Sequence, residues 1–322
     1  MPNPSSSLAT LRPDLGGSFM EFDLEMANQG FIGHQVMPSF EVQKASGNFG
    51  KIPIEQLLKS MPTERAPGGG YNRAMWTFEP DTFITREYGH EEPVDDNEAE
   101  IYSDYFEAEM VSAERARRIV MEAEERRIAA LIQNASAYNT VGISDEWDDA
   151  TAADPITDVN GAVDRLWAKG IIANALILTR KQFRSLRVCD SVTEKIASFG
   201  AGSAIKQRDI GLDALRAVFD LDYIFVAGGI KNTAADGLAA SCTGIWNDEY
   251  VGVTRVPNSR DIREPGFGRT FHWGLDGSNI GGAMETYRDE SVRSNIVRCR
   301  HQVQAKVLYA EAMELLSNAI TI

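Results

Sequence analysis

The chain has 322 residues, enough for one large domain or two ordinary ones, and its hydrophobic share of 43% is that of an ordinary globular protein. It carries 47 Asp and Glu residues against 32 Lys and Arg residues, a formal net charge of −15. An acidic surface repels phosphate backbones, and no basic run offsets it. Sequence-specific recognition of DNA or RNA is therefore not expected.

The segments that direct proteins to membranes are not found in the sequence. The N-terminal residues MPNPSSSLATLRPDLGG lack the charged and apolar regions of a signal peptide. The most apolar stretch, Gly170 to Thr179, is much shorter than the roughly 20 residues of a membrane-spanning helix. The three cysteines are scattered, which fits free thiols in a reducing compartment. We expect no membrane partner and synthesis in the cytosol.

Residues 1–47 are predicted to form an extended arm. Prolines and glycines interrupt it, yet apolar residues such as Phe19, Phe22 and Leu24 make it too apolar for a disordered tail. Either the arm is held against its own domain, or it becomes ordered on a partner. The candidate contact residues of the arm are Phe31, Ile32, Val36 and Phe40.

Residues 48–93 are predicted to form a long hairpin, with strands at Phe49 to Leu58 and Ala74 to Tyr88 and a glycine tip at Gly68 to Gly70. A two-stranded ribbon is marginally stable in water unless something covers its face. Either the chain's own domain or a neighbouring molecule must supply that cover. The candidate contact residues of the hairpin are Lys51, Arg65, Gly69, Arg73, Trp76, Phe78 and Arg86.

A helical segment of about 97–135 is predicted next. Asp95 or Asp96 can cap its start, and the stretch Met110 to Asn134 contains neither Gly nor Pro. Glu122 and Arg126 have the spacing of a favourable pair on its polar face. An apolar stripe runs along the opposite side, at Met110, Ala113, Val120, Ala123, Ile128, Leu131 and Ile132.

Helices and strands alternate in the rest of the chain, which predicts an α+β protein. Helices are predicted at Asn160–Lys169, Lys181–Leu186, Leu212–Phe219 and Ala310–Ser317. Strands are predicted at Ala175–Leu178, Tyr223–Val226, Gly244–Trp246, Val251–Thr254, Thr270–Trp273, Glu285–Arg288 and Asn295–Leu308.

No residue pattern in the sequence predicts a catalytic, cofactor-binding or metal site. The motifs of serine hydrolases, phosphate-binding loops and zinc proteases are missing. The acidic segment Asp145 to Asp154 lacks the spacing of a calcium-binding loop, so we interpret it as a solvated loop. None of the histidines has zinc-ligand spacing to another His or Cys: His34, His90, His272 and His301.

The order of these parts resembles the major capsid proteins of tailed bacteriophages, in the lambda-like branch of the Hong Kong phage capsid fold. The N-terminal arm ends in QVMPSFEVQKASGNFGKIPIEQLL, and an excursion, RAPGGG to EEPVDDNEAE, is similar to the extended loop of that family. The stretch AERARRIVMEAEERRIAALIQNA resembles the family's spine helix. The segments LDYIFVAGG, GIWNDEYVGVTRVP and GRTFHWGLDG follow in the family's order.

The resemblance implies four parts: an arm at 1–47, an extended loop at 48–93, a peripheral domain at 94–155 and 280–322, and an axial domain at 156–279. It also implies a structural, non-enzymatic protein that assembles with itself into hexamers and pentamers of an icosahedral shell around double-stranded DNA. In such a shell the loop lies across a neighbouring subunit. Scaffolding, decoration and portal proteins are further expected partners, and contact with DNA is expected to be non-specific. The protein would be assembled in the bacterial host cytoplasm and would reside in the virion.

Two other functions remain open from the sequence. An encapsulin-type nanocompartment shell has the same fold and holds protein cargo instead of DNA. A cytosolic α+β enzyme with a dispersed catalytic site would be a small oligomer, with residues 49–93 folded against its own body.

Overall fold

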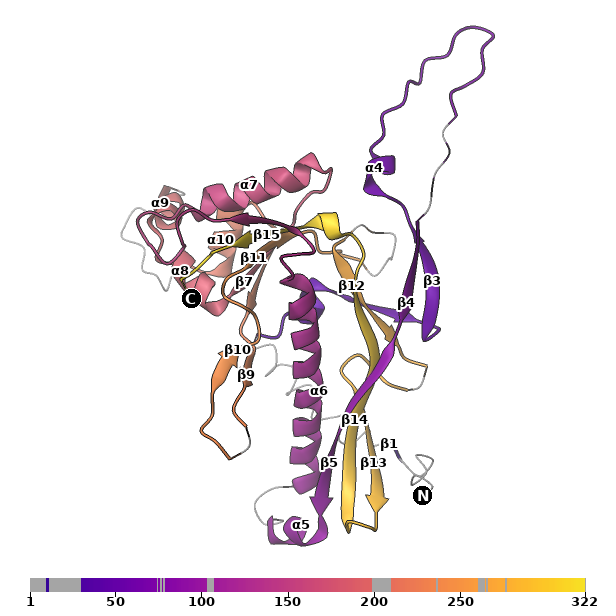
Figure 1. Cartoon of the computed structure of the whole chain (residues 1–322), viewed down its shortest axis with the longest axis vertical. Coiled ribbons are helices and arrows are strands. Elements are labelled where there is room, and N and C mark those ends of the chain that lie inside the picture. Colours follow the sequence, from indigo (N-terminus) through magenta and orange to yellow (C-terminus); the bar gives the residue numbers. More distant parts are fainter. Residues whose placement is uncertain are drawn as a thin grey trace.

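The computed structural model describes residues 10–11, 30–73, 75, 77, 79–102, 107–198, 210–235, 237–259, 264, 266–275 and 277–321. In this part of the chain, an elongated body carries one long projection (Figure 1). The body contains a six-stranded sheet beside a long helix, α6 (Ala108–Ile132), and a five-stranded sheet with shorter helices. The mixed architecture confirms the predicted α+β class.

The six-stranded sheet is built around its longest strand, β14 (Ser294–Val307). Along β14, Val297, Cys299 and Val303 are buried, while Arg298 and Arg300 point to the other face with the period of two of a strand. Helix α6 covers the buried face. The order is β1-β13-β14-β12-β2, and β5 also pairs with β14. The bounds are β1 (Thr10–Leu11), β2 (Ser39–Val42), β5 (Arg86–Asp95), β12 (Gly268–Trp273) and β13 (Ala283–Asp289).

The expected helical segment of about 97–135 is divided into two helices, α5 (Asp96–Tyr102) and α6. Glu107 stands before α6 in an extended conformation, with φ −81° and ψ 107°, and an extended residue interrupts the helical hydrogen-bond ladder. Much of the predicted apolar stripe of α6 is buried, at Ala113, Val120, Ile128 and Ile132.

The five-stranded sheet has the order β6-β15-β11-β7-β8. Strand β7, between β11 and β8, is buried on both faces: Leu176 and Leu178 meet the helices, while Ala175 and Ile177 face the end of α6. The strands are β6 (Asn139–Gly142), β7 (Ala175–Thr179), β8 (Tyr223–Ala227), β11 (Val251–Thr254) and β15 (Met313–Ser317). The helices are α7 (Pro155–Ala168), α8 (Arg180–Leu186), α9 (Asp190–Ser198) and α10 (Leu212–Phe219).

The helix predicted at Ala310–Ser317 is wrong. A single 3₁₀ turn, η3 (Ala310–Ala312), leads into β15, which pairs with β11 on one side and β6 on the other. The residues AEAMELL favour a helix by intrinsic propensity. The segment forms a strand because pairing with β11 and β6 gives hydrogen-bond partners to its backbone groups. The same arrangement buries Met313, Leu315 and Leu316.

The projection grows out of a two-stranded ribbon of β3 (Ser46–Lys51) and β4 (Glu79–Ile84). The strand predicted at Phe49–Leu58 ends earlier than expected, at Lys51. Pro53 follows and caps a short helix, α4 (Ile54–Leu57), because proline has no N–H to donate to a ladder but suits a helix start. Two smaller elements complete the fold: a helix, α3 (Gly33–Val36), and a hairpin of β9 (Ile230–Asn232) with β10 (Cys242–Gly244).

Candidate assembly surfaces

The projection stands clear of the body beyond α4 (Figure 1). Apolar side chains are exposed along it: Met75 is 96% exposed, Tyr71 73% and Leu58 58%. Short-range contacts maintain its narrow shape, since Arg65 Nε donates to the Gly69 carbonyl at 2.6 Å and its guanidinium lies 4.8 Å from the Tyr71 ring centre. A well-formed segment with uncovered apolar surface is typical of a protein–protein contact site.

The base of the projection, in contrast, is fixed to the body. Phe83 of β4 stacks on Phe271 of β12 with ring centres 4.9 Å apart. Lys306 of β14 donates to Asp81, and Tyr309 donates its hydroxyl proton to the Ile52 carbonyl at 3.2 Å. The ribbon therefore holds the projection at a set position on the body and leaves only its outer part without intrachain cover.

The hairpin residues predicted as contacts are distributed over this projection and its base. Arg65, Gly69 and Arg73 lie exposed on the outer part. Lys51 lies at the base, 3.6 Å from Glu79. Arg86 is exposed at the start of β5. Trp76 and Phe78 lie outside the described residues.

The arm residues predicted as contacts are placed differently. Ile32 and Val36 are buried in this chain's own core, together with Ile128 of α6, so in this structure they offer no surface to a neighbour. Phe31 is partly buried against the same core, and Phe40 packs edge-on against Phe271 at 6.0 Å. The apolar character of the arm predicted an ordered segment, and the surface that covers Ile32 and Val36 belongs to the same chain.

Glu125 of α6 joins three segments of the chain. Its carboxylate accepts hydrogen bonds from the backbone N–H groups of Ile32 at 3.0 Å and Gly33 at 2.8 Å, and from the indole of Trp246 at 2.8 Å. The side chain is almost completely buried. The Ile32 and Gly33 N–H groups, at the start of α3, thus both donate to one acid, which ties the arm's end to α6 and to the loop after β10.

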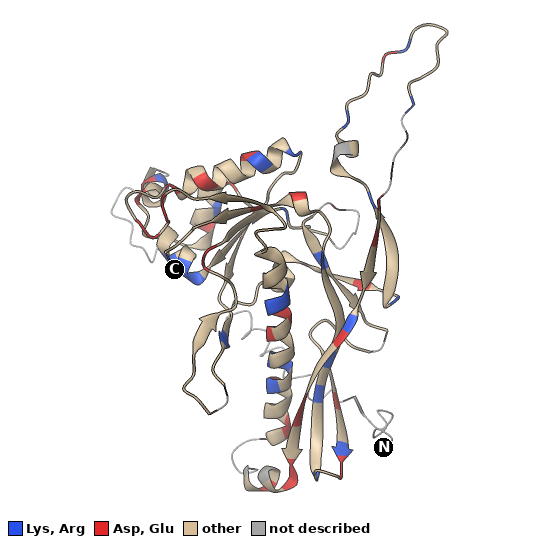
Figure 2. Cartoon of the chain, viewed as in Figure 1, with Lys and Arg blue, Asp and Glu red and all other residues tan. Residues whose placement is uncertain are grey.

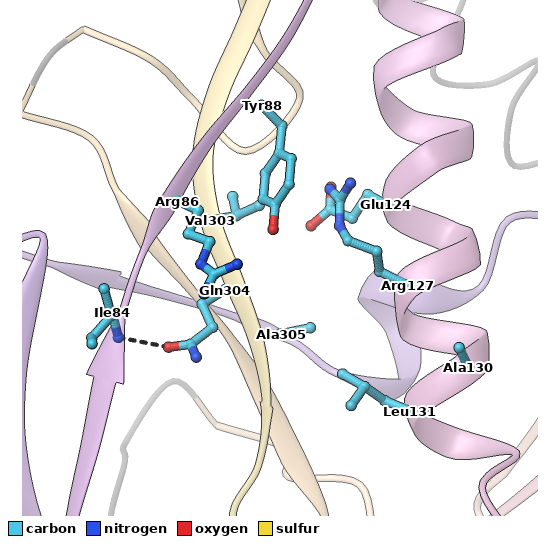
Figure 3. Close-up of a pocket in the computed structure, with 10 residues that line it drawn as sticks. All are labelled: Ile84, Arg86, Tyr88, Glu124, Arg127, Ala130, Leu131, Val303, Gln304 and Ala305. Atoms are coloured by element: carbon cyan, nitrogen blue, oxygen red, sulfur yellow. Dashed lines mark hydrogen bonds between the residues drawn. The ribbon is translucent and has the colours of Figure 1, made fainter.

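Glu124, the neighbouring acid, lies at the edge of a groove of about 480 Å³ between α6 and the β5–β14 strands (Figure 3). His34 Nε2 lies 3.2 Å from its carboxylate, and His301 Nδ1 lies 3.6 Å away. Arg127 stacks over the Tyr88 ring at 3.7 Å within the groove. Arg86 also lines this groove, which brings one of the predicted contact residues to a surface hollow.

The two adjacent acids differ in their protonation behaviour. Burial raises the pKa of Glu125 above its ordinary value, and the hydrogen bonds from Trp246, Ile32 and Gly33 offset this only in part. Burial also opposes ionisation of Glu124, but His34, His301 and Arg127 outweigh it and lower the pKa of that carboxyl. The difference follows from the partners, which are neutral donors for Glu125 and basic side chains for Glu124.

The face of the six-stranded sheet opposite α6 is charged. Glu285 of β13 accepts hydrogen bonds from Arg298, with Nε at 3.0 Å, and from Arg300, with Nη2 at 2.7 Å. Glu91 and Glu87 of β5 lie across the strands from these arginines, at 3.4 and 3.8 Å. Figure 2 shows acidic and basic residues side by side along this sheet. The charges balance one another locally, so this face keeps its net charge small.

Glu285→Gln is expected to destabilise the fold by about 1–3 kcal/mol at neutral pH. Burial opposes ionisation of Glu285, but hydrogen bonds from Arg300 and Arg298 outweigh it and lower its pKa below the ordinary 4.5. The ionised form is thus favoured by folding, and its contribution is lost as pH falls through the folded-state pKa. The difference between the two proteins in urea should shrink below about pH 4.

Glu290→Gln is the matched control, because Glu290 pairs with Arg288 of β13, the strand that holds Glu285, but is exposed. It should change stability by less than about 0.5 kcal/mol. A Glu285→Gln effect that stays constant between neutral and acid pH would contradict the assignment.

Sequence reasoning missed Glu124 and Glu125. It considered acids of this helix only as i, i+4 partners on its polar face, and the ion pair of Glu122 with Arg126 is present at 3.9 Å. A signal was available, because Glu125 stands four residues after Met121 and three before Ile128, on the buried side. An acid at that spacing within an apolar stripe indicates a buried carboxylate with a polar partner.

The described residues contain no cluster of three or more His, Cys, Asp or Glu side chains that could hold a metal ion. None of their helices is long and apolar enough to cross a membrane.

A curated relative supports the resemblance seen in the sequence. The major capsid protein of Burkholderia phage BcepMu is 25% identical to the chain over 304 residues, which cover 90% of this chain and 92% of the relative. No protein-family model matches the chain.

Solved structures share the fold. A phage-related protein from Bordetella bronchiseptica RB50 superimposes with a TM-score of 0.67 at 20% identity, covering 97% of this chain and 98% of the other. The capsid of cyanophage P-SCSP1u gives a TM-score of 0.60 at 10% identity, covering 89% and 87%. The expected resemblance is confirmed: the chain has the Hong Kong phage-type capsid fold and is a homologue of a phage major capsid protein.

Proposed function

We propose that this chain is the structural subunit of a phage head and that copies of it assemble into a closed icosahedral shell. The observation that carries the proposal is the projection of residues 52–78, which exposes Tyr71 and Met75 beyond a rigidly held base. A monomer gains nothing from such an arm in water, whereas a neighbouring copy can bury it. The fold shared with phage capsid proteins supports the same role.

Within the shell, hexamers and pentamers are the expected capsomers. The projection is the extended loop, and it lies across the neighbouring subunit. The six-stranded sheet with α6 forms the peripheral domain, and the helices around β7 and β8 form the axial domain. Sheet order favours including β6 and β15 in the axial domain, because both pair within the five-stranded sheet. The arm's end at α3 connects the two domains through Glu125.

The remaining partners follow from charge and role. A net charge of −15 in each subunit suits a wall that encloses DNA without gripping its phosphates. Scaffolding, decoration and portal proteins are its further partners, and the protein works in the virion without catalysing a reaction. Assembly takes place in the cytoplasm of the bacterial host.

Sedimentation of the purified protein tests this function. Megadalton particles with capsomer symmetry in electron micrographs are expected. A monodisperse monomer or small oligomer under all assembly conditions would reject the proposal and favour an enzyme with a dispersed site. Particles filled with one host protein instead of DNA, when isolated from native cells, would assign the chain to nanocompartment shells.

A further inference from the structure

A pocket of about 670 Å³ opens where β7 and β8 end, between α8 and the start of β9. Phe183, Val226 and Trp246 give it apolar walls. Asp248 is the only acidic side chain among the described residues that line it. Its basic residues come from α8 and the residue after it: Arg180, Lys181, Arg184 and Arg187. Figure 2 shows basic residues on α8, near the C terminus.

The pocket is unusual in so acidic a chain. It gathers four of the cations of a protein with net charge −15, and Asp248 pairs with Lys181 at 2.8 Å. Apolar surface is also uncovered at its rim, where Ile230 is 58% exposed and Leu212 36%. A surface that is both cationic and apolar fits a peptide that carries acidic and apolar side chains together.

The described part of the chain resumes at Gly30, which lies at the wall of this pocket. Gly228 and Gly229 line the pocket, and the Gly228 N–H donates to the Gly30 carbonyl at 2.9 Å. Gly30 has φ +82°, and a Cβ there would lie 2.6 Å from the Gly228 nitrogen, so glycine is required for this approach. Gly30, the first described residue after Leu11, therefore lies at the pocket's edge.

The residues that precede Gly30 in the sequence have the matching chemistry. The sequence MEFDLEM, residues 20–26, alternates apolar side chains with the acids Glu21, Asp23 and Glu25. Met26 is four residues from Gly30, a reach of at most about 14 Å. The other end of the segment follows β1, which pairs with β13 of the same chain. Both ends are thus held on one subunit. Residues 20–26 themselves lie outside the described residues.

We propose that the pocket beside α8 binds residues 20–26 of the same chain, with the acids against the α8 cations and the apolar side chains against Phe183 and Val226. The inference goes beyond the proposed role in assembly, because it concerns a single subunit. It means that the arm covers the basic cluster of the five-stranded-sheet domain and neutralises its charge.

Hydrogen exchange of the full-length, unassembled chain tests the proposal. Combining Glu21→Lys, Asp23→Lys and Glu25→Lys should speed exchange in residues 19–29 by about ten-fold or more, while α6 is unchanged. Reversing the charge of the pocket in the same protein should restore slow exchange. The substitutions for this are Arg180→Glu, Lys181→Glu and Arg184→Glu. A control with the same charge change at distant exposed acids should have no effect on residues 19–29: Glu64→Lys, Glu290→Lys and Glu311→Lys.

Three results would overturn the proposal. Exchange in residues 19–29 that is equally fast in the unmodified chain and the triple variant would show that the segment is not docked. Protection that appears only as subunit concentration rises would assign the pocket to a neighbouring copy's arm. Binding of a short DNA duplex to the unmodified chain, abolished by Arg184→Glu, would assign the pocket to nucleic acid.

Discussion

Replacing Ser60–Met75 with a short Gly-Ser linker is expected to yield a folded subunit that no longer forms particles. The ends of this segment are close, because the Thr77 N–H donates to the Gln56 side chain at 2.9 Å. None of the described residues of the outer projection adds a side chain to the buried cores, so the thermal midpoint should change little. Each large apolar side chain that a neighbour buries contributes roughly 1.5–3 kcal/mol, and this is repeated at every contact of the shell. Sedimentation and a thermal melt measure both effects.

Point variants distinguish the loss of apolar contacts from the shortening of the projection. Tyr71→Ser with Met75→Ser removes the exposed apolar groups and should weaken assembly strongly. Thr63→Ser with Glu64→Gln changes the same exposed loop without removing apolar surface, and it should assemble normally. Particles that form as well without the projection as with it would show that the shell is held by other surfaces. An unfolded subunit would show that the projection belongs to the chain's own core.

Glu125→Ala is expected to cost about 3–5 kcal/mol of folding free energy, because it leaves buried donors without an acceptor. Those donors are the Ile32 and Gly33 amides and the Trp246 indole. The start of α3 should then detach from α6. Urea unfolding gives the free energy, and the fluorescence of Trp246, an otherwise buried indole, reports the local opening.

Two further variants test whether the effect of Glu125→Ala comes from the loss of its buried acceptor oxygens. Glu125→Gln keeps one carbonyl oxygen as an acceptor at nearly the same volume, so it should lose about 1–2 kcal/mol. Glu122→Gln alters a half-buried acid on the same helix that pairs with the exposed Arg126, and it should stay within about 0.5 kcal/mol of the parent. A Glu125→Ala loss below about 1 kcal/mol would mean that water or rearrangement satisfies the donors.

Local patterns in the sequence were enough to identify many elements. Helix α10 covers Leu212–Phe219, as predicted, and strand β11 covers Val251–Thr254, as predicted. The alternation after Asn295 became β14, and the glycine tip marked the outer part of the projection. These features depend on the period at which apolar side chains recur and on the conformational freedom of the backbone. Both can be read from residues that are close in the sequence.

Only the tertiary structure decided which surface covers each apolar face. The spacing of Ile32 and Val36 reveals a buried side, but it is equally satisfied by a neighbour or by Ile128 of the same chain, which the structure selects. The segment after Ala312 favours a helix until β11 and β6 offer hydrogen bonds on both sides. Glu125 is acceptable inside α6 because three donors from distant segments meet it there. Each of these outcomes depends on contacts between residues far apart in the chain, and local periodicity carries no information about them.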